Sequence, residues 1–166
     1  RDENGDPIRD ADSTSYVGTF HGCRDAGILL HQEAQRRGYG TARQVVCIGD
    51  GAAWVWENMR LSFPGAQQIL DFYHASEHLG HLAAALLGSG SAAAKERQSH
   101  WCHQLKNSDS QDIIEQAQRE LKARQSQLSE AQIEAAEREI AYFQTHAERS
   151  HYGEYRARGW FIGSGV

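Results

Sequence analysis

The sequence has few of the features that mark secreted or membrane proteins. It contains three cysteines, and no two of them form a C-x-x-C pair. An odd number of widely spaced cysteines indicates neither a disulfide framework nor a cysteine-ligated zinc site, and it fits a reducing compartment. No apolar stretch approaches the roughly 20 residues that a membrane-spanning helix needs. Residues 1–13 are polar, without a signal-peptide pattern, and we expect a loop there.

A strong net charge is also absent. The 166 residues include 17 Lys and Arg against 22 Asp and Glu, a formal net charge of −5. This mild acidity argues against a domain whose role is to coat nucleic acid. It does not limit an active site, whose carboxylates are negative before a metal binds. The length suffices for the core of one domain, or of one domain with an insertion.

The stretch 44–81 organises the rest of the prediction. Residues 45–48 form a continuous apolar run, which is typical of a strand buried on both faces. Residues 67–72 form a second strand, and residues 52–62 between them have the apolar spacing of a helix that ends before a Pro-Gly pair. A strand, a helix and a strand in succession predict a βαβ unit with parallel strands.

Asp50 and Asp71 end these two strands. Parallel strands have their C-terminal ends at the same edge of a sheet, where open α/β sheets bind ligands. Two carboxylates brought together there suit Mg²⁺ or Mn²⁺, and two such ions can promote phosphodiester cleavage. Gly51 would let backbone and substrate approach closely. The alternative is that each aspartate only caps the helix after it, because Asp is a favoured N-cap residue.

Three histidines follow the second strand. His74, His78 and His81 have the spacing of one helix face, and His74 begins at the edge that carries the aspartates. Such side chains can transfer protons, contact phosphate or bind metal, or they can be packing residues between the sheet and later helices. For His74, the closeness to Asp71 favours a functional role.

The same region contains a competing motif. His74, Glu77 and His78 satisfy H-x-x-E-H, the inverted zinc-protease pattern, in which two histidines bind zinc and the glutamate acts as a base. So short a pattern is weak evidence, and it leaves the strand-terminal aspartates unexplained. A zinc metallopeptidase is therefore an alternative reading.

The flanking segments complete the predicted fold. Residues 14–20 are rich in Thr, Tyr, Val and Phe and predict an edge strand, and residues 24–37 predict a helix that ends at a glycine. Residues 74–87 predict a helix, and residues 91–150, rich in Ala, Glu, Gln, Arg and Leu, predict packed helices. By themselves, these helices would also suit a non-enzymatic module that binds protein or DNA. Residues 151–166 predict a loop that returns to the sheet.

The returning segment holds a last candidate. Arg156 and Arg158 precede a Gly-Ser-Gly turn centred on Ser164. Backbone N–H groups of such a turn can approach a phosphate, with an arginine as counter-charge. The alternative is an ordinary surface loop.

Four motifs in this order resemble bacterial insertion-sequence transposases of the ISKra group. They are I-G-D-G-A-x-W-V-W at 48–56, F-P-G-A at 63–66, I-L-D-F-Y-H-A-S-E-H-L at 69–79 and R-G-x-x-I-G-S-G-V at 158–166. Those enzymes are DDE transposases with an RNase H-like fold, related to the Mutator-like elements. The order and spacing of the motifs make the resemblance specific.

The resemblance implies an α/β fold: an RNase H-like mixed sheet with a large all-α insertion. It divides the chain into a partial catalytic core at 1–78, the helical insertion at 79–150 and the returning segment at 151–166. It also implies that Asp50 is the second acidic metal ligand of the D-D-E triad. Asp71 and His74 would form the Asp-x-x-His signature that supports the site.

The resemblance further implies metal-dependent cleavage and strand transfer at transposon ends. The partners would be terminal-repeat and target DNA, within a homo-oligomeric complex in the bacterial cytoplasm. The family's first aspartate is expected upstream of Arg1 and its glutamate just past Val166, and neither Glu77 nor Glu154 replaces them. We therefore expect a fragment that is inactive by itself.

Overall fold

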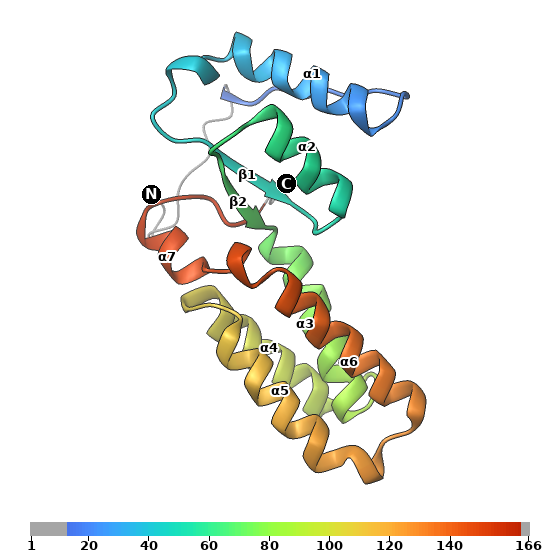
Figure 1. Cartoon of the computed structure of the whole chain (residues 1–166). Helices are drawn as coiled ribbons and strands as arrows, with labels where there is room; N and C mark the ends of the chain where they lie inside the picture. The colour runs from blue at the N-terminus through green and yellow to red at the C-terminus, as the bar shows by residue number, and fades with distance from the viewer. Residues whose placement is uncertain (1–12, 164–166) are drawn as a thin grey trace.

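The computed structural model describes residues 13–163, in which a small α/β part leads into a block of helices (Figure 1). Two parallel strands, β1 (Val46–Gly49) and β2 (Gln67–Leu70), are joined by α2 (Ala53–Ser62). The register pairs the first residue of β1 with the first of β2, and the last with the last. The predicted βαβ unit is confirmed. No third strand pairs with these two in the described part of the chain.

The two faces of β1 are covered unequally. Cys47 is buried, and a Cβ on Gly49 would lie 2.8 Å from Cγ1 of Val55, so α2 packs closely on this side. Val46 and Ile48, on the opposite face, are only half-buried. The expectation of a strand buried on both faces is met only in part, because Val46 and Ile48 pack against the core but stay partly exposed. An apolar run does not show which neighbouring elements cover the strand.

The N-terminal part contains α1 (Cys23–Arg36) and a short 3₁₀ helix, η2 (Tyr39–Thr41). The predicted helix is confirmed, and α1 lies on α2, where the side-chain amide of Asn58 donates to the carbonyl of Cys23 at 2.6 Å. The predicted strand at 14–20 is wrong, because these residues form no regular element. A β-prone segment needs a partner strand, and none lies beside it among the described residues.

Four long helices form the block: α3 (Phe72–Leu87), α4 (Ala92–Asn107), α5 (Gln111–Arg124) and α6 (Glu130–Thr145). Serine side chains cap two of them. Ser91 caps α4, and Ser129 forms a capping box with Gln132 at the start of α6. The core between the helices is apolar, with Trp101 fully buried. The predicted packed helices are confirmed.

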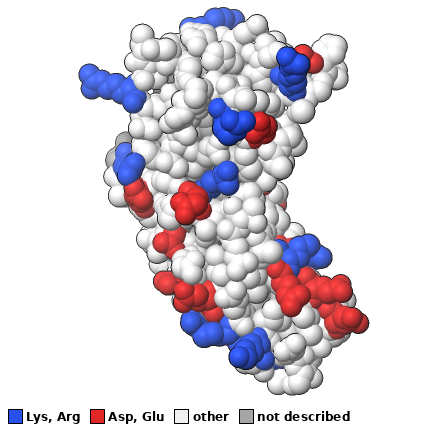
Figure 2. All heavy atoms as spheres, in the orientation of Figure 1, with Lys and Arg blue, Asp and Glu red and all other residues white. Residues whose placement is uncertain are grey.

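The helix α3 connects the sheet to the helical block. It runs without a break past residues 78 and 79, so the predicted boundary between core and insertion falls inside this helix. No helix in the described range is both long and apolar enough to cross a membrane. On the face shown in Figure 2, basic and acidic side chains are interspersed, without a broad patch of one sign.

The short helix η3 (Gln125–Gln127) follows α5 and precedes α6, within the helical block. After α6 the chain returns to the sheet through η4 (Ala147–Arg149) and α7 (Tyr152–Ala157). The prediction of a loop from residue 151 onward is thus wrong for α7. This helix forms because Tyr152 and Tyr155, three residues apart, bury their rings on one side. The Tyr152 hydroxyl donates to the carbonyl of Leu70 at 2.9 Å, which ties α7 to the end of β2.

Candidate active site at the C-terminal edge of the sheet

Asp50 lies in the tight turn that follows β1, with its side chain exposed. Its Oδ1 accepts a hydrogen bond from the backbone N–H of Ala52 at 3.0 Å, which closes the turn. The N-cap of α2 is Ala52 itself, so Asp50 does not cap that helix. The second carboxylate oxygen, Oδ2, accepts no hydrogen bond from a described residue. This exposed oxygen suits a hard divalent cation such as Mg²⁺ or Mn²⁺.

Asp71 has a different role at the neighbouring strand end. Its side chain is buried, and Oδ1 accepts from the N–H groups of Tyr73 at 2.8 Å and His74 at 3.2 Å. It is therefore the N-cap of α3, as the capping alternative predicts. Its own N–H donates to the carbonyl of Gly49 at 2.8 Å, which locks the two strand ends together. The cap fixes where α3 begins and thus where His74 stands.

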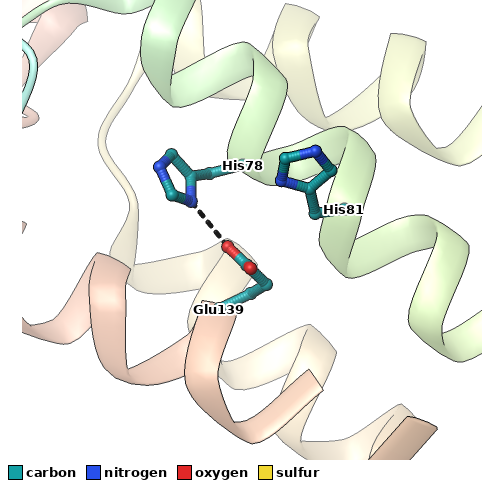
Figure 3. Close-up of side chains that lie close together, drawn as sticks. All are labelled: His78, His81 and Glu139. Atoms are coloured by element: carbon teal, nitrogen blue, oxygen red, sulfur yellow. Dashed lines mark hydrogen bonds and ion pairs between the residues drawn. The ribbon is translucent and has the colours of Figure 1, made fainter. Parts of the chain in front are cut away.

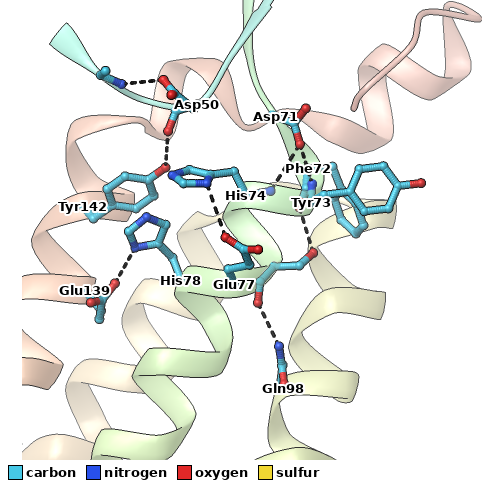
Figure 4. A network of polar contacts seen from close by, with 12 residues as sticks. Asp50, Asp71, Phe72, Tyr73, His74, Glu77, His78, Gln98, Glu139 and Tyr142 are labelled. Carbon is cyan, nitrogen blue, oxygen red and sulfur yellow. Dashed lines mark hydrogen bonds and ion pairs between the residues drawn. The ribbon is translucent and has the colours of Figure 1, made fainter. Parts of the chain in front are cut away.

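One open cleft joins the predicted residues. Asp50, Asp71, His74 and Glu77 line it beside residues of β1 and α2, and its volume is about 470 Å³. Figure 4 shows the first three at the ends of the two strands and the start of α3. His74 Nδ1 lies 3.5 Å from Oε2 of Glu77, and both side chains are partly exposed. The cleft is therefore lined both by the available carboxylate of Asp50 and by the imidazole of His74.

The cleft is not a preassembled three-ligand metal site. Among residues 13–163, the group of three whose ligand atoms all lie within 4.8 Å of one another is His78, His81 and Glu139, on α3 and α6. Asp71 caps α3 through Oδ1, which fits the supporting role expected for it better than that of a second metal ligand equal to Asp50. Asp50 fits as one ligand of a larger set.

The structure adds residues from α6 that the sequence analysis missed. The Tyr142 hydroxyl donates to the backbone carbonyl of Asp50 at 3.2 Å, and the Tyr142 ring stacks on His78 at a centroid distance of 3.6 Å. His146 is buried next to it, with ring centroids 4.7 Å apart. The sequence does contain a pattern that could have indicated them. Glu139, Tyr142 and His146 have the i, i+3, i+7 spacing of residues on one helix face.

Burial determines the protonation states of Tyr142 and His146. It raises the pKa of Tyr142 well above its usual range, and the carboxylates of Asp50, Glu139 and Asp71 raise it further. Tyr142 is thus a neutral phenol and a steady donor. Burial, and then the charge of Arg149, lower the pKa of His146 to about 4, so this imidazole is neutral near pH 7. The Nδ1 atom of His146 has no hydrogen-bond partner among the described residues.

Gly51 lets α6 approach the turn. Its φ is +101°, and an added Cβ would lie 2.8 Å from the Tyr142 hydroxyl and 3.2 Å from Nε2 of His146. We expect Gly51→Ala to lower the free energy of unfolding by about 2–4 kcal/mol, from backbone strain and overpacking together. Urea unfolding measures this loss.

Gly65→Ala is the matched control. Gly65 also has a positive φ, of +82°, but an added Cβ would meet nothing within 4 Å. We therefore expect only the strain, about 1 kcal/mol. Equal losses in the two variants would show that the contact of Gly51 with α6 contributes nothing.

The returning segment reaches the same edge of the sheet. The carbonyl of Ile162 accepts from the N–H of Phe72 at 2.9 Å, and Gly163 lies against the ring of Tyr73. A Cβ on Gly163 would be 3.8 Å from Oδ1 of Asp71. The expected return to the sheet is confirmed as far as residue 163. Ser164 lies outside the described residues.

The two predicted arginine contacts do not line the cleft. Arg156 donates to Oδ1 of Asn107 at 3.0 Å, at the end of α4. Arg158 is hydrogen-bonded to Glu154, and its guanidinium lies 4.9 Å from the ring centroid of Trp160.

The H-x-x-E-H residues are not brought together as a ligand set. His74 and Glu77 line the cleft, whereas Nδ1 of His78 pairs with Oε2 of Glu139 on α6 at 2.6 Å. The ring centroids of His74 and His78 lie 4.9 Å apart, but no group of three close ligand atoms among the described residues contains both of them. Comparison of the chain with known protein families, curated proteins and solved structures finds no match.

Proposed function

We propose that this chain is the central part of an RNase H-like catalytic domain of a DDE-type DNA transposase. The observation that carries the proposal is Asp50, with an available carboxylate oxygen, at the end of β1, next to Asp71 and His74 at the end of its parallel neighbour. Further support comes from the helical block that follows the βαβ unit and from the return of residues 162–163 to the sheet edge. The four sequence motifs point to the same family.

Each residue at this edge of the sheet has a separate role in the proposed reaction. Asp50 would hold Mg²⁺ or Mn²⁺ together with acidic residues outside this chain. A bound ion of this kind activates water and stabilises the leaving oxygen of a phosphodiester. Asp71 positions His74 through the helix cap, and His74 faces the cleft to transfer a proton or contact a phosphate. Tyr142 holds the Asp50 turn in place through the backbone carbonyl.

DNA is the proposed partner, as transposon ends and target. With a net charge of −5, binding would depend on the cleft and on a few individual arginines outside it rather than on a broad basic surface. Arg156 and Arg158 are proposed phosphate contacts that would turn from the protein toward DNA; at present Arg156 donates to Asn107 and Arg158 to Glu154. A homo-oligomeric complex and a bacterial cytoplasmic location follow from the same proposal.

The test is a cleavage and strand-transfer assay with Mg²⁺ or Mn²⁺ on DNA that carries the element's own ends. One sample is a protein that contains this chain together with the acidic residues expected on both sides. The other sample is the 166-residue chain alone. We expect activity only from the first sample.

Two outcomes would contradict the proposal. Cleavage by the chain alone would show that the ligand set lies within it. An inactive longer protein, with helices that still bind a protein or DNA partner, would favour the interaction module.

A further inference from the structure

A second group of ligands lies one turn along α3 from His74. His78 and His81 extend from α3 toward Glu139 on α6, and their ligand atoms lie within 4.8 Å of one another (Figure 3). None of the three is needed for the catalytic role proposed for Asp50. The two histidines are three residues apart, so they share one helix face.

Two of the three side chains are already held in place. Glu139 is buried, with 6% of its surface exposed, and its Oε2 lies 2.6 Å from Nδ1 of His78. The ring of His78 is fixed from one side by the stacked Tyr142 ring, with an interplanar angle of 13°. The other Glu139 oxygen lies 3.9 Å from Nε of Arg138. A buried carboxylate facing two imidazoles is unusual for a purely packing role, because burying its charge is costly.

The third side chain leaves the group open. His81 is exposed, so an ion can enter from solvent and the ring can change its rotamer. Zinc ligands at about 2.0–2.2 Å in a tetrahedron stand roughly 3.4 Å apart. The ligand atoms here all lie within 4.8 Å of one another, so the widest pair must close by at most about 1.4 Å, which movement of His81 can supply. The hydrogen-bonded pair of His78 and Glu139, at 2.6 Å, must open by about 0.8 Å as the ion replaces the shared proton.

The donor set indicates which ion would bind. Two imidazole nitrogens and one carboxylate suit Zn²⁺ and leave a fourth position for water, whereas Mg²⁺ prefers oxygen ligands only. We propose that His78, His81 and Glu139 bind one Zn²⁺ ion that clamps α3 to α6. The clamp would join the helix that carries His74 to the helix whose Tyr142 holds the Asp50 turn. This site is independent of the proposed transposase activity.

The experiment is a zinc titration of the chelator-treated 166-residue chain, followed by calorimetry and by thermal unfolding. We expect one ion per chain and a melting temperature that rises with zinc concentration. His81→Ala and Glu139→Gln should each weaken zinc binding at least about tenfold. Because His81 is exposed, His81→Ala keeps the fold even if Glu139→Gln disturbs the helix contact.

Two control variants locate the ion. His100→Ala removes an exposed histidine on α4, and Asp50→Ala removes the exposed carboxylate of the cleft. Both should bind zinc as the unmodified chain does. The proposal is overturned if the unmodified chain binds no zinc, or if His81→Ala leaves binding unchanged. Loss of binding in Asp50→Ala alone would place the ion in the cleft instead.

Discussion

Asp50→Asn is expected to lower the rate of DNA cleavage by about 10³-fold in a protein that contains this chain and the flanking acidic residues. The change keeps the size of the side chain but removes the charge that would bind the metal. Metal-ion catalysis contributes several kcal/mol of transition-state stabilisation, and each 1.36 kcal/mol is about tenfold in rate. Single-turnover cleavage rates at saturating Mg²⁺ measure the effect, and urea unfolding checks that the variant is folded.

Asp109→Asn is the matched control. Asp109 Oδ1 accepts from the N–H of Gln111 at 2.9 Å, two residues along the chain, as Asp50 Oδ1 accepts from Ala52 at 3.0 Å. The two aspartates thus have the same local role, but Asp109 does not line the cleft. We expect Asp109→Asn to cleave at nearly the unmodified rate. Equal rates in the two variants would mean that Asp50 only closes its turn.

The stability of the chain is expected to fall between pH 6.5 and about 4 because of His146. Its pKa is lowered from 6.5 to about 4 by burial first, and then by Arg149, His78 and His74. In this window the unfolded chain binds a proton that the folded chain excludes, so unfolding becomes easier as the pH falls. The slope is at most about 1.4 kcal/mol per pH unit, a total of about 3 kcal/mol.

Urea unfolding at several pH values measures this slope. His146→Gln removes the titrating group and should flatten the curve relative to the unmodified chain. His100→Gln removes an exposed histidine on α4 and should leave the slope as it was. Carboxylates also titrate toward pH 4, but they are the same in all three proteins. A slope that His146→Gln leaves unchanged would show that His146 takes up its proton without unfolding the chain.

The local patterns predicted most helices and the βαβ unit, because their signals lie within a few residues. Pro64 and Gly65 end α2, and Ser91 caps α4, as short-range chemistry dictates. The secondary-structure predictions that were wrong concern segments whose conformation depends on partners distant in the sequence. Residues 14–20 are β-prone but lack a neighbouring strand, and α7 forms where Tyr152 finds the carbonyl of Leu70.

The sequence by itself determined that Asp50 and His74 stand at one edge of a parallel sheet. Strand direction and the right-handed crossover leave no other arrangement for a βαβ unit. Only the tertiary structure decided their separate roles, with Asp71 turned inward as a helix cap and Asp50 left open. It also decided that Tyr142 reaches Asp50 across 92 residues and that Glu139 meets His78. Such contacts depend on how α6 packs against α3, and no local pattern encodes that packing.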